Sequence, residues 1–249
     1  DCAAALANPL PSLAELAEAR GLKTGIVSTA RITHATPAGS YAHAANRNWE
    51  DSASLPPEAK AAGCKDIAQQ LLDTPYGDGP DVILGGGRAH FLPDSVVDPE
   101  HSKKTGKRDD GRNLIEQWLQ SRSGREYVWN RQDFLALSER RAKGEGSNGQ
   151  VMGLFEPSHM QFEADRANDP AGEPSLLEMT QFALAEMQKA DQGYFLLIEA
   201  GRIDHAHHGS NAYRALVDTV ALSEAVQWVT DHVDLSDTLI LVTADHSHT

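Results

Sequence analysis

Acidic and imidazole side chains follow two short apolar runs of the chain, residues 194–198 and 238–242. Short apolar runs of this kind are typical of buried strands. Residues just beyond the carboxyl ends of strands line the sites of open α/β sheets. The sequence therefore predicts one site that collects the side chains after both runs, which are Glu199, Asp204, His208, Asp245 and His246.

The spacing of these residues suits metal ions. Asp204 and His208 are four apart, so one helical turn can present both to a single divalent ion. The adjacent pair Asp245-His246 offers one oxygen and one nitrogen ligand from a strand end, a mixture that zinc accepts. Glu199 brings a carboxylate without a nitrogen, which suits a harder ion such as Mg²⁺. Any one of these residues alone is more typical of a helix cap or a solvated loop, and only their combination predicts a metal centre.

Helix and strand patterns alternate along the chain and would position this site. The fold class predicted from this alternation is α/β, a mostly parallel sheet with helices on both faces. We expect strands at 23–29, 81–84, 126–129, 194–198 and 238–242, and helices at 12–21, 57–72, 112–120, 131–141, 175–190 and 211–230. Polar residues 89–111 and 142–150 are expected to be surface loops, and residues 1–249 to form a single domain.

Composition limits the classes of partner. The chain has 249 residues and a formal charge of -14, from 36 acidic and 22 basic side chains. Net repulsion argues against docking on nucleic acid or an anionic membrane. A small phosphate ester can still bind, because metal ions and an arginine reverse the potential locally. No apolar run approaches the roughly 20 residues that span a bilayer.

Several longer segments resemble one known family in the same order. Residues 28–49 run Ser-Thr-Ala-Arg-Ile-Thr-His-Ala-Thr-Pro-Ala-Gly-Ser-Tyr-Ala-His-Ala-Ala-Asn-Arg-Asn-Trp. With the two segments that carry the metal-ligand types, they resemble the alkaline phosphatases, especially the branch with the animal enzymes. The similarity continues through residues 81–88, 127–130 and 153–157, so that it covers nearly the whole chain. It implies an alkaline phosphatase-like fold and metal-dependent hydrolysis of small phosphate monoesters through a phosphoserine intermediate.

The resemblance assigns roles at the main site. It implies one zinc ion on Asp204 and His208, and a second on Asp245 and His246. It places Mg²⁺ on Thr36 and Glu199, with His34 beside that ion, and it assigns phosphate binding to Arg47. His205 and His248 are expected to orient ligands or phosphate rather than to bind metal directly.

The resemblance also implies a separate Ca²⁺ site. Its ligands would be Glu100, the Phe155-Glu156 pair, and either Asp169 or Glu173, since an insertion leaves both opposite the last ligand. Alignment on the following segment, residues 174–180, favours Glu173. Oxygen ligands of this kind suit Ca²⁺.

Further expectations concern the protein around this chain. The family's nucleophilic serine, an aspartate that bridges two metals and a third zinc-binding histidine have no counterpart here, so the fold is expected to be incomplete at both ends and inactive alone. The two cysteines, Cys2 and Cys64, correspond to a disulfide of the animal-type enzymes and imply an extracellular or periplasmic location. The complete enzyme is expected to be a homodimer, and a membrane-anchored form is kept as an alternative.

Two other motifs and two other functions need weighing. Gly85-Gly-Gly87 lacks the Lys-Ser/Thr of a phosphate-binding loop, so a tight strand exit is expected. Asp51-Ser52-Ala53 imitates the family's nucleophile segment at the wrong place and is interpreted as a decoy. A sulfatase or phosphodiesterase of the same superfamily, or a non-catalytic metal-binding module, remain alternative functions.

Overall fold

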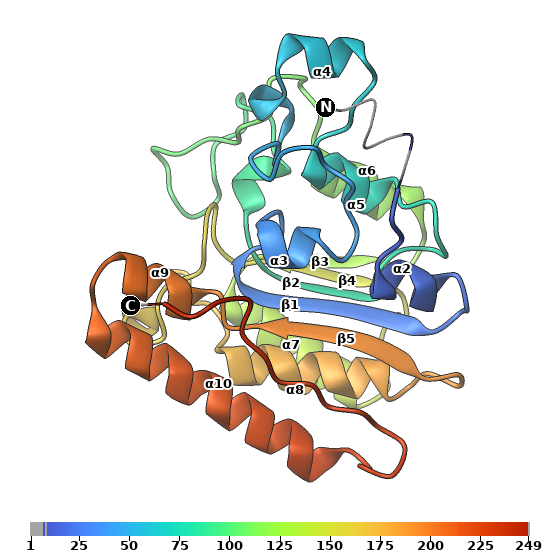
Figure 1. Ribbon diagram of the computed structural model, residues 1–249, viewed down its shortest axis with the longest axis vertical. Coiled ribbons are helices and arrows are strands. Elements are labelled where there is room, and N and C mark those ends of the chain that lie inside the picture. The colour runs from blue at the N-terminus through green and yellow to red at the C-terminus, as the bar shows by residue number, and fades with distance from the viewer. Residues whose placement is uncertain (1–6, 8, 249) are drawn as a thin grey trace.

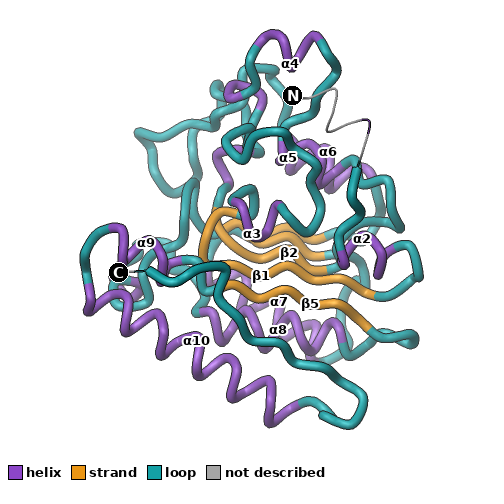
Figure 2. The backbone as a smooth tube through the Cα atoms, in the orientation of Figure 1, coloured by secondary structure: helices purple, strands orange, loops and turns teal. Residues whose placement is uncertain are grey.

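A five-stranded, fully parallel sheet forms the centre of the computed structural model, which describes residue 7 and residues 9–248 (Figures 1 and 2). The strand order is β3-β4-β2-β1-β5. The strands are β1 (Lys23–Arg31), β2 (Val82–Gly86), β3 (Glu126–Val128), β4 (Val151–Leu154) and β5 (Tyr194–Glu199). This sheet confirms the predicted α/β class.

Helices cover both faces of the sheet, also as predicted. On one face α5 and α6 pack on Ile26, Ile83 and Met152; on the other, α7, α8 and α10 pack on Val27 and Leu84 (Figure 1). The α-helices are α2 (Leu13–Glu18), α3 (Ala35–Ala38), α4 (Pro57–Ala61), α5 (Ile67–Leu72), α6 (Leu114–Ser121), α7 (Arg131–Ala142), α8 (Leu176–Met187), α9 (Arg202–His208) and α10 (Ala212–His232). Three short 3-10 helices are η1 (Ser52–Ser54), η2 (Arg88–His90) and η3 (Arg166–Asn168).

Local signals explain several helix boundaries. Ser12 and Glu15 form the predicted capping box of α2, in which each side chain accepts from the other's backbone N–H. Ser175 and Glu178 form the same motif at α8. The sequence predicted one helix over 57–72, but the structure has two helices there, α4 and α5. Gly63 takes a left-handed conformation with φ +80° after α4, and Asp66 then caps α5.

The expected strand over 238–242 is wrong. These residues join no ladder of the sheet, and Leu239 and Leu241 are 81% and 79% exposed. An apolar run forms a stable strand only where neighbours pair its backbone and cover its face. Among the described residues β5 is the strand at this edge of the sheet. If residues 238–242 paired with β5, their own outer edge would have no strand to pair with. Asp245 and His246 therefore follow an irregular segment rather than a strand.

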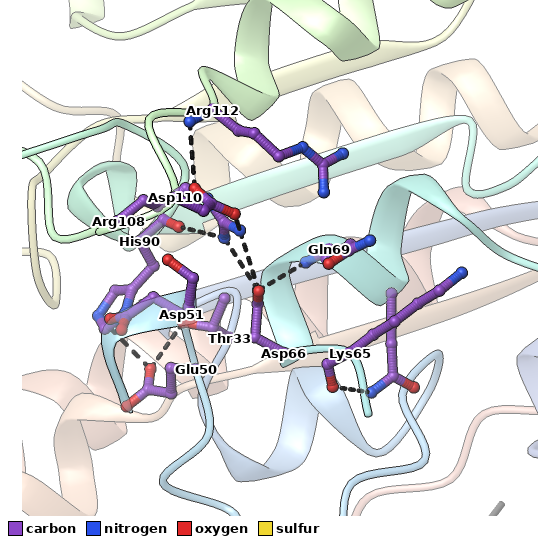
Figure 3. Close-up of polar contacts among 12 residues, drawn as sticks. Thr33, Glu50, Asp51, Lys65, Asp66, Gln69, His90, Arg108, Asp110 and Arg112 are labelled. Carbon is purple, nitrogen blue, oxygen red and sulfur yellow. Dashed lines mark hydrogen bonds and ion pairs between the residues drawn. The ribbon is translucent and has the colours of Figure 1, made fainter. Parts of the chain in front are cut away.

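The interpretation of residues 89–111 as a surface loop is wrong for part of the segment, because residues 89–93, 98, 106 and 108 are buried while most of the others are exposed. Phe91 and Arg108 in this segment are fully buried. Figure 3 shows Arg108 between Asp66 and Asp110, and its guanidinium donates to both carboxylate oxygens of Asp66 at 3.0 Å. A hydrophilic composition predicted exposure, but these charges pair with one another inside the fold.

The glycine segment after β2 is a tight strand exit, as expected. Gly87 has φ +99°, a conformation that favours glycine, and a Cβ at Gly86 would overlap the carbonyl oxygen of Ser158. Ser52 is buried, and its hydroxyl accepts from the backbone N–H of Asp109 at 3.0 Å. That contact gives Ser52 a structural role, in line with its interpretation as a decoy.

Two expectations can be compared only with the residues that the structure describes. Cys2 lies outside them, so its predicted disulfide with Cys64 stays a prediction; Cys64 itself is not a free thiol. In the part of the chain that the structure describes, no helix combines the length and apolar character needed to cross a membrane.

Candidate functional site

The neighbouring strands β1 and β5 bring the first site residues together. Ser28 of β1 lies opposite Glu199, the last residue of β5. The Glu199 carboxylate accepts hydrogen bonds from the hydroxyls of Ser28 and Thr36, and Thr36 lies on α3 just beyond β1. Burial raises the pKa of Glu199 although these hydrogen bonds oppose the shift. Thr36 and Glu199, the two predicted Mg²⁺ ligands, therefore share one oxygen-rich position at the carboxyl edge of the sheet.

Helix α9 supplies the next pair. It begins three residues after Glu199 and carries Asp204 and His208 one turn apart. The Nε2 atom of His208 lies 3.5 Å from Oδ2 of Asp204. The expected helical-turn geometry is thus present.

The irregular segment after α10 returns to α9, and the chain end lies beside that helix in Figure 1. The Nε2 atom of His246 lies 3.8 Å from Oδ1 of Asp204 and 3.5 Å from Oδ2 of Asp245. The Nε2 atom of His248 lies 3.5 Å from the same Oδ1. The Nε2 atom of His248 is therefore as close to Asp204 as that of His208, and its predicted orienting role stays a prediction.

The donor set around Asp204 fits zinc. Oδ1 of Asp204 is buried and has no hydrogen-bond donor among the described residues, while ligand atoms of His208 and His248 lie within 4.8 Å of it. A carboxylate and imidazoles are among the usual zinc ligands. Asp204 therefore fits the role of a cation ligand better than that of a surface aspartate whose hydrogen bonds are all made.

Three histidines beside this centre each contact one arginine. Nη2 of Arg47 lies 3.2 Å from Nε2 of His34, and Nη1 of Arg202 lies 3.0 Å from Nδ1 of His205. Guanidinium groups only donate, so the contacted nitrogen of each histidine accepts and its proton sits on the other nitrogen. The third pair is Arg31 with His159.

His159 is the residue near the main site that sequence reasoning missed. Its ring centroid lies 4.0 Å from that of His205 and 5.0 Å from that of His34. Burial, followed by the charge of Arg31, lowers the pKa of His159 to about 2. Burial and the charge of Arg202 lower the pKa of His205 to about 4. The imidazoles of His159 and His205 are therefore neutral across the physiological range.

A second acidic cluster contains the predicted Ca²⁺ ligands. Glu156 shares one group with Glu100 and His101, and another with Asp169 and Glu173; in each group the ligand atoms lie within 4.8 Å of one another. The side chain of Phe155 packs on Phe134 in the core, so only its backbone carbonyl could serve as a ligand.

The structure brings both Asp169 and Glu173 to this cluster, where the sequence left a choice between them. Burial and the Glu100 carboxylate raise the pKa of Asp169 to about 7. Burial and the Glu156 carboxylate raise the pKa of Glu173 to about 9. Both oxygens of Asp169 and Oε2 of Glu173 are buried without a hydrogen-bond partner in the described residues. Buried carboxylates without partners are costly, so the cluster fits a cation.

His101 is a second residue that the pattern missed. Its Nε2 lies 3.3 Å from Oε2 of Glu156. The position of His101 directly after Glu100, a predicted ligand, could have indicated it. For His159, the signal would have been its place beyond the end of β4, but four residues of that strand were too few to recognise.

The chain is similar to known proteins along almost its whole length. A family model described as "Alkaline phosphatase" matches residues 3–249. The membrane-bound alkaline phosphatase of Bombyx mori is 42% identical over 255 residues, which cover 100% of this chain and 44% of that protein. The tissue-nonspecific isozyme of Gallus gallus is also 42% identical over 255 residues, with 99% and 47% covered. The chain thus spans less than half the length of these relatives.

Solved structures show the same fold. The alkaline phosphatase of Thermus thermophilus superposes with a TM-score of 0.65 and 28% identity, over 89% of this chain and 40% of that one. The cold-active enzyme of Shewanella sp. gives 0.62 and 24%, over 90% and 44%.

Proposed function

Because the chain belongs to the alkaline phosphatase family, we propose that the protein containing it hydrolyses small phosphate monoesters at a centre with two zinc ions and one Mg²⁺. The observation that supports this most is the convergence of His208, His246 and His248 on Asp204, beside the pair Arg47–His34. A family match over residues 3–249 favours a phosphatase over a sulfatase or phosphodiesterase.

Each residue of the centre has a proposed part. Asp204 and His208 hold one zinc, Asp245 and His246 the other, and Thr36 and Glu199 hold Mg²⁺. When bound, these ions cancel the charge of the phosphate and stabilise the attacking and leaving oxygens. Arg47 is exposed and makes no ion pair with a described residue, so its planar fork is available to bind two phosphate oxygens.

The proposal is tested on the full-length protein. It should hydrolyse p-nitrophenyl phosphate at alkaline pH, lose that activity to a chelator, and regain it with Zn²⁺ and Mg²⁺. The sulfate analogue and bis(p-nitrophenyl) phosphate are the matched controls. Preference for either control by orders of magnitude would reject the assignment.

The Mg²⁺ position predicts a selective effect of Glu199→Gln. Removing the charge while keeping the shape should lower Mg²⁺ occupancy and leave zinc bound, because Asp204 and its histidines are unchanged. Metal analysis after dialysis checks this. Equal losses of zinc and Mg²⁺ would contradict the separation of the two positions.

We also propose that Glu100, Glu156, Asp169, Glu173 and the carbonyl of Phe155 hold Ca²⁺, with Asp169 and Glu173 acting together. This is supported by the unpartnered oxygens of both residues and by the carboxylates within reach. The ligand charge tunes Ca²⁺ affinity.

Asp169→Asn and Glu173→Gln should each weaken Ca²⁺ binding by about 10-fold, since each removes one charged ligand at nearly constant shape. Calorimetric titration of the calcium-depleted protein measures this. The control is Asp191→Asn, an exposed aspartate before β5. If only one of the two variants binds more weakly, the other residue is not a ligand.

The setting of the enzyme is part of the proposal. A disulfide between Cys2 and Cys64, which is part of the proposal, would indicate an oxidising compartment, outside the cell or in a periplasm. The relative in Bombyx mori is described as membrane-bound, so an anchored form is compatible with that location. Residues 1–249 would belong to one α/β domain, and the complete enzyme would be a homodimer.

A further inference from the structure

Arg202, the first residue of α9, contacts His205 on the same helix. Its backbone N–H donates to Oγ1 of Thr29 on β1 at 3.2 Å, which ties the start of α9 to the sheet. Its Nη1 lies 3.0 Å from Nδ1 of His205. A guanidinium group only donates, so Nδ1 accepts and the proton of the neutral imidazole sits on Nε2. Arg202 therefore selects one of the two tautomers of His205.

The guanidinium of Arg202 is held by an aromatic ring. Its Cζ atom lies 3.7 Å from the ring centroid of Phe162, in the loop between β4 and α8. Among the described residues Arg202 forms no ion pair, and its Nε atom is buried without a hydrogen-bond partner. Attraction between the cation and the ring face is therefore the main contact that fixes this side chain, apart from His205 itself.

Phe162 is in turn held against α10. Arg214 of that helix places its Cζ atom 4.7 Å from the same ring centroid, and its Nε lies 2.7 Å from Oδ2 of Asp165. The backbone N–H of Glu163 donates to Asp218, a buried aspartate of α10, at 3.3 Å. These contacts attach the loop after β4 to α10 on both sides of the ring.

His205 also lies near the residues proposed to hold phosphate. Its ring centroid is 5.4 Å from that of His34, and Nε2 of His34 lies 3.2 Å from Nη2 of Arg47. With Nδ1 engaged by Arg202, Nε2 is the nitrogen left for a further contact. A protonated Nε2 can donate to a phosphate oxygen, whereas the other tautomer would present a lone pair to it. Phosphate binding therefore depends on which tautomer His205 adopts.

We propose that Arg202 is a positioning residue, which holds His205 with Nε2–H presented to the bound phosphate, and that Phe162 keeps Arg202 in place. This role rests on the proposed phosphatase function and adds to it two residues that act only through His205. The loop after β4 then controls phosphate binding without contacting the substrate.

The kinetic test measures kcat/KM for p-nitrophenyl phosphate and the inhibition constant of inorganic phosphate in the full-length protein. Arg202→Met removes the donors and should lower kcat/KM and raise the inhibition constant, each by about 10-fold, as for residues that orient a site. Phe162→Leu should change each by about threefold, the size of one cation–π contact. Arg202→Lys keeps a donor and should recover most of the loss. Arg125→Met is the matched control: Arg125 lies over the ring of Trp118 at 4.7 Å, before β3, and its loss should change neither quantity.

A double-mutant cycle separates positioning from a structural part. In a His205→Ala background, Arg202→Met should have no further effect on either quantity, because Arg202 acts through His205 alone. A further loss of about 10-fold in that background would overturn the positioning role.

Nitrogen-15 spectra of the histidine side chains give a readout that needs no activity. The signals of His205, identified by their absence in His205→Ala, should show a protonated Nε2 in the wild type and a mixture of tautomers in Arg202→Met. A protonated Nδ1 in the wild type would overturn the positioning role even in an active enzyme. A wild type that has the expected tautomer but is inactive on p-nitrophenyl phosphate would overturn the phosphatase proposal, and with it the part of Arg202 in the reaction.

Discussion

The Asp204→Ala variant of the full-length protein is expected to lose phosphatase activity by more than about 100-fold, together with one of its two proposed zinc ions. Asp204 is the carboxylate that His208, His246 and His248 all approach. Changes to residues that only support metal ligands already cost about 10- to 100-fold, so loss of the shared ligand should cost more. Turnover of p-nitrophenyl phosphate and zinc content per chain are the measurements.

Asp191→Ala is the matched control for this variant. Asp191 is an exposed aspartate at the opposite end of β5 from Glu199, so its removal should change neither quantity. Full zinc occupancy in the Asp204 variant would show that the convergence on α9 is not the metal centre.

The second large effect is on stability. Arg108→Met should lower the free energy of unfolding by about 3–5 kcal/mol, because it leaves Asp66 buried without its charge partner. The guanidinium of Arg108 is fully buried, and both carboxylate oxygens of Asp66 accept from it at 3.0 Å (Figure 3). Chemical denaturation of the calcium-loaded protein measures the change.

Arg122→Met is the corresponding surface change. Arg122 pairs with Asp78, and both side chains are about half exposed. Exposed pairs contribute roughly 0–1 kcal/mol, so this variant should unfold almost like the wild type. Similar losses in the two variants would show that burial of the Arg108 pair does not set its contribution.

The sequence predicted those parts of the fold that depend on local chemistry. The capping box at Ser12, the strands β1 and β5, and the helical turn of Asp204 and His208 follow from spacing along the chain. The strand over 238–242 failed because strand formation depends on a neighbour that spacing does not supply. β4 was missed for the converse reason: it has four residues, and its position between β2 and β3 is what makes it a strand.

The candidate site also has residues that the sequence predicted and residues that it missed. Ligand types at Asp204, His208 and Glu199 could be predicted because they follow an apolar run in sequence. His159 approaches His205 only through the fold, across 46 residues, and an imidazole next to an arginine carries no pattern of its own. The sequence favoured Glu173 over Asp169 at the second cluster, and only the folded loop shows that both carboxylates lie close to Glu156.

The irregular tail has a thermodynamic consequence for the metal centre. His246 and His248 reach Asp204 from a segment that joins no strand, and the chain between them and α9 includes the whole of α10. A cation bound by Asp204 and His208 of α9 together with His248 of the tail would close a loop of about 40 residues, and the entropy lost in that closure would be subtracted from the intrinsic affinity of the ligands. A zinc ion at this proposed position would then be a cross-link as well as a cofactor, and any contact that holds residues 238–248 in place would raise its affinity without touching a ligand.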